Sequence, residues 1–460
     1  MSLSQVRPCL FVLCLASSSQ CVSAATLLHD VPLTAYQSVS SAQSMPDQPE
    51  LIALSMASGD FNGDGITDLA VSYESGSEPY LFIYPGNHDY LYPQATRARD
   101  YEDSTLAPFL EASFSLPVPQ GFQYLTAGDF NADGLLDLAG GVEGQSSITF
   151  FAGNGSGGMA ISEPFPLGGS LTTMIAGEVN RRDGLADIVV GIESDTGAEL
   201  LVFQGPSGAL NQPPQRIILP QPAASLVTGE INGLPGLDIG VAAGNELVLV
   251  HGKFATTRAE LQSADTSLAP TVERQTLTSS ILGLAYSGQR NGGQNRGGLS
   301  VFLDSGEIET LQVRNQEQDA GLTQDFNDGA SESLWQRVAD VTSIENLAPG
   351  YIASVAPVHM DSKVYWLVNR EDGLASSLVG KEASNNDSAS LAAGNVLTTL
   401  PLRLNADGQL DQIVMQSNNG APGVVDAGTD MYDAFNGVVD LYAAATGANG
   451  LTMTISGLDP

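Results

Sequence analysis

The stretch Asp60-Phe61-Asn62-Gly63-Asp64-Gly65-Ile66-Thr67-Asp68 occurs again, with few changes, as Asp129-Phe130-Asn131-Ala132-Asp133-Gly134-Leu135-Leu136-Asp137. Both copies place oxygen-bearing side chains at loop positions 1, 3, 5 and 9 and a glycine at position 6. Calcium takes about six to eight oxygens, so these side chains, the backbone carbonyl of position 7 and water can hold one ion. The glycine permits the positive φ that a sharp turn needs. We therefore predict a Ca²⁺ site in each loop.

The two loops are rich in carboxylates that would repel one another without a cation. The alternative is an Asn/Asp/Gly hairpin turn that binds nothing. The predicted calcium ligands are Asp60, Asn62, Asp64, Ile66, Asp68, Asp129, Asn131, Asp133, Leu135 and Asp137.

Three further copies of the loop have lost part of the pattern. The copy that starts at Glu178 has one extra residue and two arginines but keeps its oxygen donors. Its predicted ligands are Glu178, Asn180, Asp183 and Asp187. The copy that starts at Glu230 has Leu234 in place of the central carboxylate, so we expect it to bind no metal. The copy that starts at Arg403 begins with a cation, which could pair with a loop carboxylate in place of a metal.

Short runs rich in Val, Ile, Leu and small residues follow the loops, as in 68–73 and 187–192. Runs of this length and composition predict buried strands rather than helices. Four such runs can be traced in the third unit and again in the fourth, which is typical of a propeller blade. Two later units, at 281–313 and 335–368, keep apolar runs but have no acidic loop. The predicted units start near residues 50, 122, 171, 225, 280, 335 and 396.

The run Gly59 to Gly65 and the run Gly128 to Gly134, each with the Asp-Leu-Ala that follows, resemble the FG-GAP (or VCBS-type) repeat of the integrin α-subunit β-propeller. The resemblance covers most of residues 40–445 and is strongest in the first two copies. It implies an all-β fold: a seven-bladed β-propeller of four-stranded blades, with calcium in hairpin loops between first and second strands. Integrin-like adhesion is not implied, because no ligand-contact motif of that family is present.

Residues 1–24 have the features of a secretory signal peptide: Arg7, an apolar stretch at 9–16 and the small-residue site Val22-Ser23-Ala24. All three cysteines lie in this segment, so we expect no disulfide in the remaining 25–460. We expect a secreted, periplasmic or cell-surface protein. Its formal net charge of −35 argues against nucleic acid and anionic membrane as partners. No other stretch is apolar enough for membrane insertion.

The sequence contains no G-x-S-x-G, P-loop or H-E-x-x-H motif, so we do not expect an enzyme. We predict a binding or adhesion module for an extracellular glycan or protein. Two alternatives stay open: an extracellular polysaccharide-processing enzyme that uses paired carboxylates, and a structural domain of a cell-surface assembly. The long segment between the first two loops has aromatic and basic residues that could bind a ligand or only cover a blade edge. The candidate ligand-binding residues there are His88, Tyr90, Tyr92 and Tyr101.

A closed ring of sheets needs its last sheet joined to its first, since an open ring exposes two unpaired edges. The apolar run at 29–36 precedes the first unit and has no other evident partner. We therefore expect it to complete the last unit. The run at 451–455 is the competitor for that position.

Overall fold

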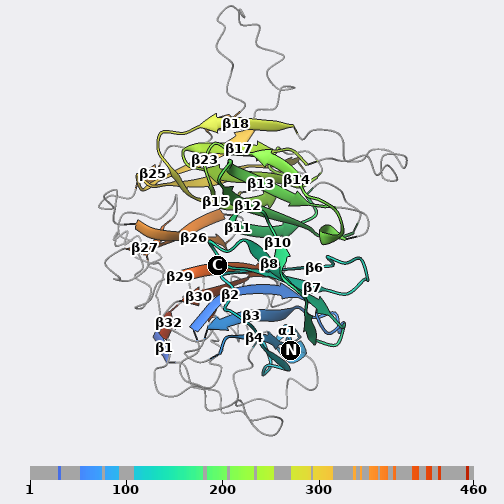
Figure 1. Cartoon of the computed structure of the whole chain (residues 1–460). Coiled ribbons are helices and arrows are strands. Elements are labelled where there is room, and N and C mark those ends of the chain that lie inside the picture. The colour runs from blue at the N-terminus through green and yellow to red at the C-terminus, as the bar shows by residue number, and fades with distance from the viewer. Residues whose placement is uncertain are drawn as a thin grey trace, which may run out of the picture.

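The computed structural model describes residues 30–32, 52–74, 78–92, 108–179, 184–204, 208–232, 236–252, 271–287, 289–291, 294–313, 335–337, 342–343, 352–360, 363–370, 377–379, 396–402, 411–416, 423–425 and 452–454. This part of the chain is almost entirely antiparallel β-structure (Figure 1). Its two helices are one-turn segments, α1 (His88–Leu91) and η2 (Ala209–Asn211). None of the described helices could cross a bilayer. The predicted signal peptide lies outside the described residues.

The first four sheets are each built mainly from strands that follow one another along the chain. The first sheet contains β2 (Ile52–Gly59), β3 (Asp68–Glu74), β4 (Tyr80–Tyr84) and β5 (Phe114–Pro117). The second contains β6 (Tyr124–Gly128), β7 (Asp137–Gly141) and β8 (Ser147–Gly153), with β9 (Met159–Ile161) and β10 (Phe165–Pro166) both paired to β8. The third contains β11 (Ser170–Gly177), β12 (Asp187–Ser194), β13 (Gly197–Phe203) and β14 (Gln215–Ile218). The fourth contains β15 (Ala223–Gly229), β16 (Asp238–Ala243), β17 (Glu246–Val250) and β18 (Val272–Thr276).

Three later sheets continue the same order. The fifth contains β19 (Ile281–Tyr286), β22 (Leu299–Leu303), β23 (Glu307–Val313), β24 (Trp335–Arg337) and β25 (Thr342–Ser343), and a short hairpin of β20 (Gln289–Asn291) and β21 (Gln294–Arg296) lies between its first two strands. The sixth contains β26 (Ile352–Met360), β27 (Lys363–Arg370) and β28 (Ser377–Val379). The next contains β29 (Val396–Leu402), β30 (Asp411–Gln416) and β31 (Gly423–Val425).

The first strands of these sheets contact one another in sequence: β2, β6, β11, β15, β19, β26 and β29, and β29 contacts β2 again. Figure 1 shows the return, with red β29 and β30 beside blue β2. Antiparallel sheets packed around such a cycle have the architecture of a β-propeller. The second strands β3, β7 and β16 each begin with an aspartate and continue mainly with small and branched apolar residues. They are buried along almost their whole length, which explains these apolar runs.

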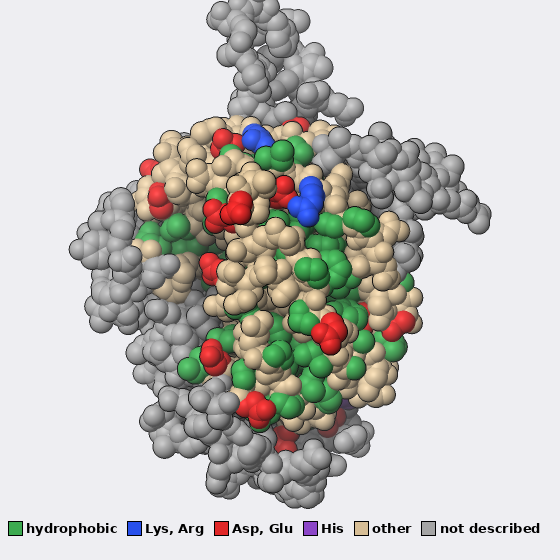
Figure 2. Space-filling view, in the orientation of Figure 1, with side chains coloured by type: hydrophobic (Ala, Val, Ile, Leu, Met, Phe, Trp, Pro, Cys, Tyr) green, Lys and Arg blue, Asp and Glu red, His purple; other side chains and the backbone are tan. Residues whose placement is uncertain are grey.

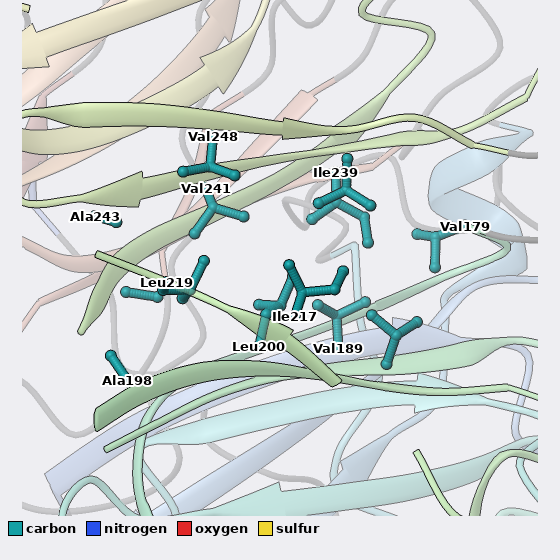
Figure 3. Close-up of a cluster of buried hydrophobic side chains, with 13 residues drawn as sticks. Val179, Val189, Ala198, Leu200, Ile217, Leu219, Ile239, Val241, Ala243 and Val248 are labelled. Carbon is teal, nitrogen blue, oxygen red and sulfur yellow. The ribbon is translucent and has the colours of Figure 1, made fainter. Parts of the chain in front are cut away.

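The hydrophobic core lies between neighbouring sheets rather than at one centre. Between the third and fourth sheets, for example, Val189 and Leu200 pack with Val241 and Val248 (Figure 3). Similar clusters join the second sheet to the third and the fourth to the fifth. Leu400 of β29 packs against the core of the first sheet. Each sheet therefore buries its faces on its neighbours.

The predicted start of the sixth unit, near residue 335, is wrong. There, β24 pairs with β23, as does β25, so this segment forms the outer edge of the fifth sheet. The sixth sheet begins instead at β26, which contacts β19 as a first strand should. The error has a physical cause: without an acidic loop to mark the first strand, an apolar outer strand has the same pattern as an inner one.

The chain ends also differ from the expectation. β1 (Asp30–Pro32) pairs with β32 (Thr452–Thr454), with Val31 opposite Met453. The two candidate closing strands therefore pair with each other in a separate two-stranded sheet, and neither pairs with β31 in the described part of the chain. Pairing with each other satisfies backbone groups of both ends at once.

Candidate calcium-binding loops

The first loop connects β2 to β3 and is organised by the side chain of Asp60. Its Oδ1 accepts hydrogen bonds from the backbone N–H groups of Gly63 (2.8 Å) and Asp64 (3.1 Å). Its Oδ2 accepts one from Gly65 (2.9 Å). Farther along, Asn62 Oδ1 accepts from Asp64 N–H and Asp64 Oδ1 accepts from Ile66 N–H, both at 2.8 Å. The polar side chains thus wrap their own backbone into a tight loop.

The second loop, between β6 and β7, repeats these bonds one for one. Asp129 accepts from the N–H groups of Ala132 (2.8 Å), Asp133 (3.2 Å) and Gly134 (2.9 Å). Asn131 Oδ1 accepts from Asp133 N–H and Asp133 Oδ1 accepts from Leu135 N–H, again both at 2.8 Å. Two segments with different neighbours therefore have the same local structure, which the loop sequence itself must specify.

The donor set and the backbone of both loops suit a calcium ion. Carboxylate and amide oxygens are the ligands that calcium prefers, and the acidic side chains at position 5, Asp64 and Asp133, are exposed. The glycines at position 6 have φ of +85° at Gly65 and +84° at Gly134, as the sharp turn requires. Among the described residues, no three His, Cys, Asp or Glu side chains are already gathered around one point.

The aspartate at position 9 has a second role that the sequence pattern did not reveal. Asp68 is fully buried, and it accepts hydrogen bonds from the N–H groups of Phe61 and Gly86, both at 2.9 Å. Asp137, also buried, accepts from Phe130 (3.0 Å) and Gly153 (2.9 Å). The carboxylate thereby joins the start of the loop to the end of the third strand. We call this arrangement the aspartate clip.

Of the eroded loops, the one that starts at Glu230 has the whole clip, and the one that starts at Glu178 shows its bond to the start of the loop. Asp187 accepts from Val179 N–H at 2.9 Å. Asp238, in the loop that lacks a central carboxylate, accepts from the N–H groups of Asn232 and Gly252, both at 2.9 Å. The aspartate therefore holds the loop whether or not the metal donors are complete.

Burial sets the electrostatics of the clip in the first two loops. It raises the pKa of the Asp68 carboxyl to about 6, and the Asp64 carboxylate adds to the rise while backbone donors oppose it. Burial likewise raises the pKa of Asp137 to about 6, with backbone donors again opposing. A cation next to these groups would favour their charged form.

The clip requires glycine at the end of the third strand. A Cβ would lie 2.5 Å from the Thr67 carbonyl oxygen at Gly86, and 1.9 Å from that of Leu136 at Gly153. At Gly252 it would lie 2.3 Å from the Leu237 oxygen. The sequence does contain a signal for this glycine, a large apolar residue two positions before it. The three occurrences in the described part of the chain are Tyr84-Pro85-Gly86, Phe151-Ala152-Gly153 and Val250-His251-Gly252.

The first two loops also touch the next sheet. Gly157, in the hairpin after β8, donates its N–H to the carbonyl oxygen of Phe61 at 2.9 Å. The side chain of Leu136 packs so closely on Gly59 that a Cβ there would lie 2.6 Å from its Cδ1. In the same way, Gly208 lies against the backbone of Phe130 in the second loop. An ion in either loop would therefore stiffen a joint between two sheets.

The structure describes only some of the remaining predicted calcium ligands. Glu178 and Asp187 flank the third loop, while Asn180 and Asp183 lie outside the described residues, as does the loop that starts at Arg403. The third loop stays a prediction.

The residues predicted to bind a ligand in the segment between the first two loops differ in their exposure. Tyr90, on α1, is only 9 % exposed and belongs to the core cluster of the first sheet, so its prediction as a ligand contact is wrong. The one-turn helix directs it inward toward the core that contains Phe109. His88 and Tyr92 are exposed, and their ring centroids lie 5.0 Å apart. Tyr101 lies outside the described residues.

Comparison with known proteins supports the repeat. Residues 53–82 match the family model described as FG-GAP repeat, which covers most of β2, the first loop, β3 and the start of β4. No curated protein matches the chain. The structure is similar to that of BBS1N in complex with ARL6DN, soaked with mercury (12 % identity over 84 % of this chain and 94 % of that chain, TM-score 0.47). It is also similar to Chaetomium thermophilum Sqt1 (12 % identity over 89 % and 88 %, TM-score 0.46).

At these TM-scores the two likenesses do not identify the fold, which rests on the strand pairings. The class of protein that follows is an all-β protein of antiparallel sheets that carries an FG-GAP repeat. The first loop, inside the matched segment, is its best-defined site.

Proposed function

We propose that this chain is a secreted, calcium-stabilised seven-bladed β-propeller that acts by binding an extracellular protein or glycan rather than by catalysis. The cyclic contact of the first strands supports the ring. The single observation that carries the calcium proposal is that two separate loops repeat the same side-chain-to-backbone hydrogen bonds around the same oxygen donors.

Calcium would serve stability first. Asp60, Asn62 and Asp64 would hold the ion in the first loop, with the Ile66 carbonyl and Asp68 completing the set; the second loop offers the equivalent residues. A ligand that binds only the folded chain stabilises it by about 2.7 kcal/mol at a hundredfold excess over Kd. Because the loops also contact the next sheet, a bound ion would also stabilise the packing of neighbouring sheets.

The calcium proposal is tested by counting bound ions and by melting the protein with calcium or with a chelator. We expect calcium to raise the Tm. Asp64→Ala and Asp133→Ala should each lose one ion, and Asp195→Ala, an exposed aspartate in the turn between β12 and β13, should lose none. Melting curves that superimpose with and without calcium, or unchanged ion counts in the two loop variants, would contradict the proposal.

The charge of the surface fits a neutral or positively charged partner better than a polyanion. Figure 2 shows acidic side chains scattered over one face and few basic ones, and the chain has a formal net charge of −35. Such a surface disfavours negatively charged partners through like-charge repulsion. A glycan array and a panel of extracellular proteins, each probed with the parent chain and with an Asp64→Ala/Asp133→Ala double variant, test the proposed binding role. Absence of any calcium-sensitive ligand from both would count against a binding module.

A further inference from the structure

The loop that starts at Glu230, between β15 and β16, is the fourth loop. It differs from the first two because a histidine lies beside its clip. His251 stands between β17 and the clip glycine, Gly252. Its Nε2 is 3.0 Å from Glu273 Oε1 on β18, and its Nδ1 is 3.7 Å from Asp238 Oδ1 on β16. Its side chain is only 18 % exposed and Asp238 only 1 %. Two carboxylates thus converge on one half-buried imidazole, beside the loop from which the central carboxylate is missing.

The amide of Asn232 ties the same imidazole to the loop. Asn232 Nδ2 lies 2.9 Å from His251 Nδ1 and 3.0 Å from Asp238 Oδ1. An amide N–H₂ only donates, so in this arrangement Nδ1 accepts and the imidazole is neutral, with its proton on Nε2. Protonation of Nδ1 would require the Asn232 amide to turn and release its bond to Asp238.

The carboxylates favour that second proton. The contact between Nε2 and Glu273 has the distance of an ion pair, but it does not meet the angle of a hydrogen bond. The other Glu273 oxygen, Oε2, is buried without a hydrogen-bond partner among the described residues. A positive imidazolium would compensate both carboxylates, as calcium would in the acidic loops. The nearby Arg274 does not serve this purpose, because it pairs with Glu246 and with the carbonyl of Ile218.

We infer that protonation of His251 stabilises the fourth sheet. The imidazolium, held between Asp238 and Glu273, takes the place that we propose for a metal ion in the first two loops. The contacts of His251 connect three elements: the loop through a hydrogen bond with Asn232, the second strand through the charge of Asp238, and the outer strand through the charge of Glu273. Hydrogen bonding and the charges of Asp238 and Glu273 raise the pKa of His251 above its usual 6.5, against the cost of burial. Because the folded-state pKa is raised, this contribution to stability is complete below 6.5 and is lost as the pH rises through the folded value.

The first test is an NMR titration of the histidine ring protons, assigned with His251→Gln. We expect His251 to titrate above pH 6.5. Glu273→Gln should lower the midpoint, because it removes one attracting charge. Asn232→Ala should raise it, because it removes the donor that favours the neutral ring. A purely structural role would not predict opposite shifts. A midpoint at or below 6.5, or an unchanged midpoint in both variants, would overturn the inference.

The second test is the Tm at pH 6 and pH 8, with calcium in excess and again with a chelator. The parent chain should lose more stability between these pH values than His251→Gln, in both media. His88→Gln, which alters an exposed histidine, is the matched control and should behave like the parent. Equal losses in the parent and His251→Gln would contradict the inference. The result in chelator separates it from the calcium proposal, which can fail while the histidine effect remains.

Discussion

The first and fourth loops share one half of their structure and differ in the other. In both, a buried aspartate, Asp68 or Asp238, accepts backbone N–H bonds from the loop and from a glycine after the third strand. Around it, the first loop has carboxylates at positions 1 and 5, whereas the fourth has Leu234 at the central position and His251 nearby. The clip is therefore separable from the proposed cation site. A loop without the central carboxylate still has the hydrogen bonds of the clip.

The largest effect that sharpens this comparison comes from removing the clip itself. Asp137→Ala and Asp238→Ala each leave two backbone N–H groups without their acceptor. Unpaired donors of this kind cost about 1–3 kcal/mol each, so we expect a loss of about 3 kcal/mol in both variants. Chemical denaturation measures it, with Asp195→Ala as the control.

Asp137→Ala and Asp238→Ala should lose similar stability, but the number of bound calcium ions should distinguish them. Asp137→Ala is expected to lose one ion, while Asp238→Ala should lose stability without losing an ion. If Asp238→Ala were as stable as the parent chain, the clip would not stabilise the fold independently of a bound ion. If it lost an ion, the fourth loop would be a metal site after all.

A somewhat smaller effect is expected from the clip glycines. In Gly153→Ala and Gly252→Ala, the new methyl group would meet a carbonyl oxygen at 1.9 and 2.3 Å, so the backbone must shift. Overpacking of this kind costs about 1–3 kcal/mol, and we expect about 2 kcal/mol in both loops. Gly134→Ala is the matched control, since it has positive φ but nothing within 4 Å of its Cβ. It should cost less in thermal melts. Losses at Gly153 and Gly252 no larger than the loss at Gly134 would show that the close approach to the carbonyl oxygen is not the dominant cost.

The strands beside the loops could be predicted from sequence because each is a short β-type run between punctuating glycines. The clip could not, since the spacing from aspartate to glycine varies: 18 residues from Asp68, 16 from Asp137 and 14 from Asp238. The aspartate was also fully explained by the metal pattern, which hid its second role. The inward direction of Tyr90 and the partner of β24 depend on tertiary packing, which apolar periodicity alone does not contain.

The smallest effect concerns position 4, where the two acidic loops differ from each other. Gly63 has φ of +76° in the first loop, and Ala132 adopts +66° in the second, the one non-glycine residue with positive φ in the described part of the chain. A left-handed alanine costs about 1–2 kcal/mol, whereas glycine there pays about 0.5–1 kcal/mol in lost chain freedom. Gly63→Ala should therefore lower the free energy of unfolding, and Ala132→Gly should raise it, by about 0.5–1 kcal/mol each.

Denaturation in chelator, where bound metal cannot mask so small a difference, measures both variants. The double variant Gly63→Ala/Ala132→Gly should return close to the parent value, because the residues lie in separate loops and their effects should add. Two destabilising single variants would mean that Ala132 is held by contacts particular to the second loop. In that case the shared hydrogen bonds of the two acidic loops would not imply shared energetics.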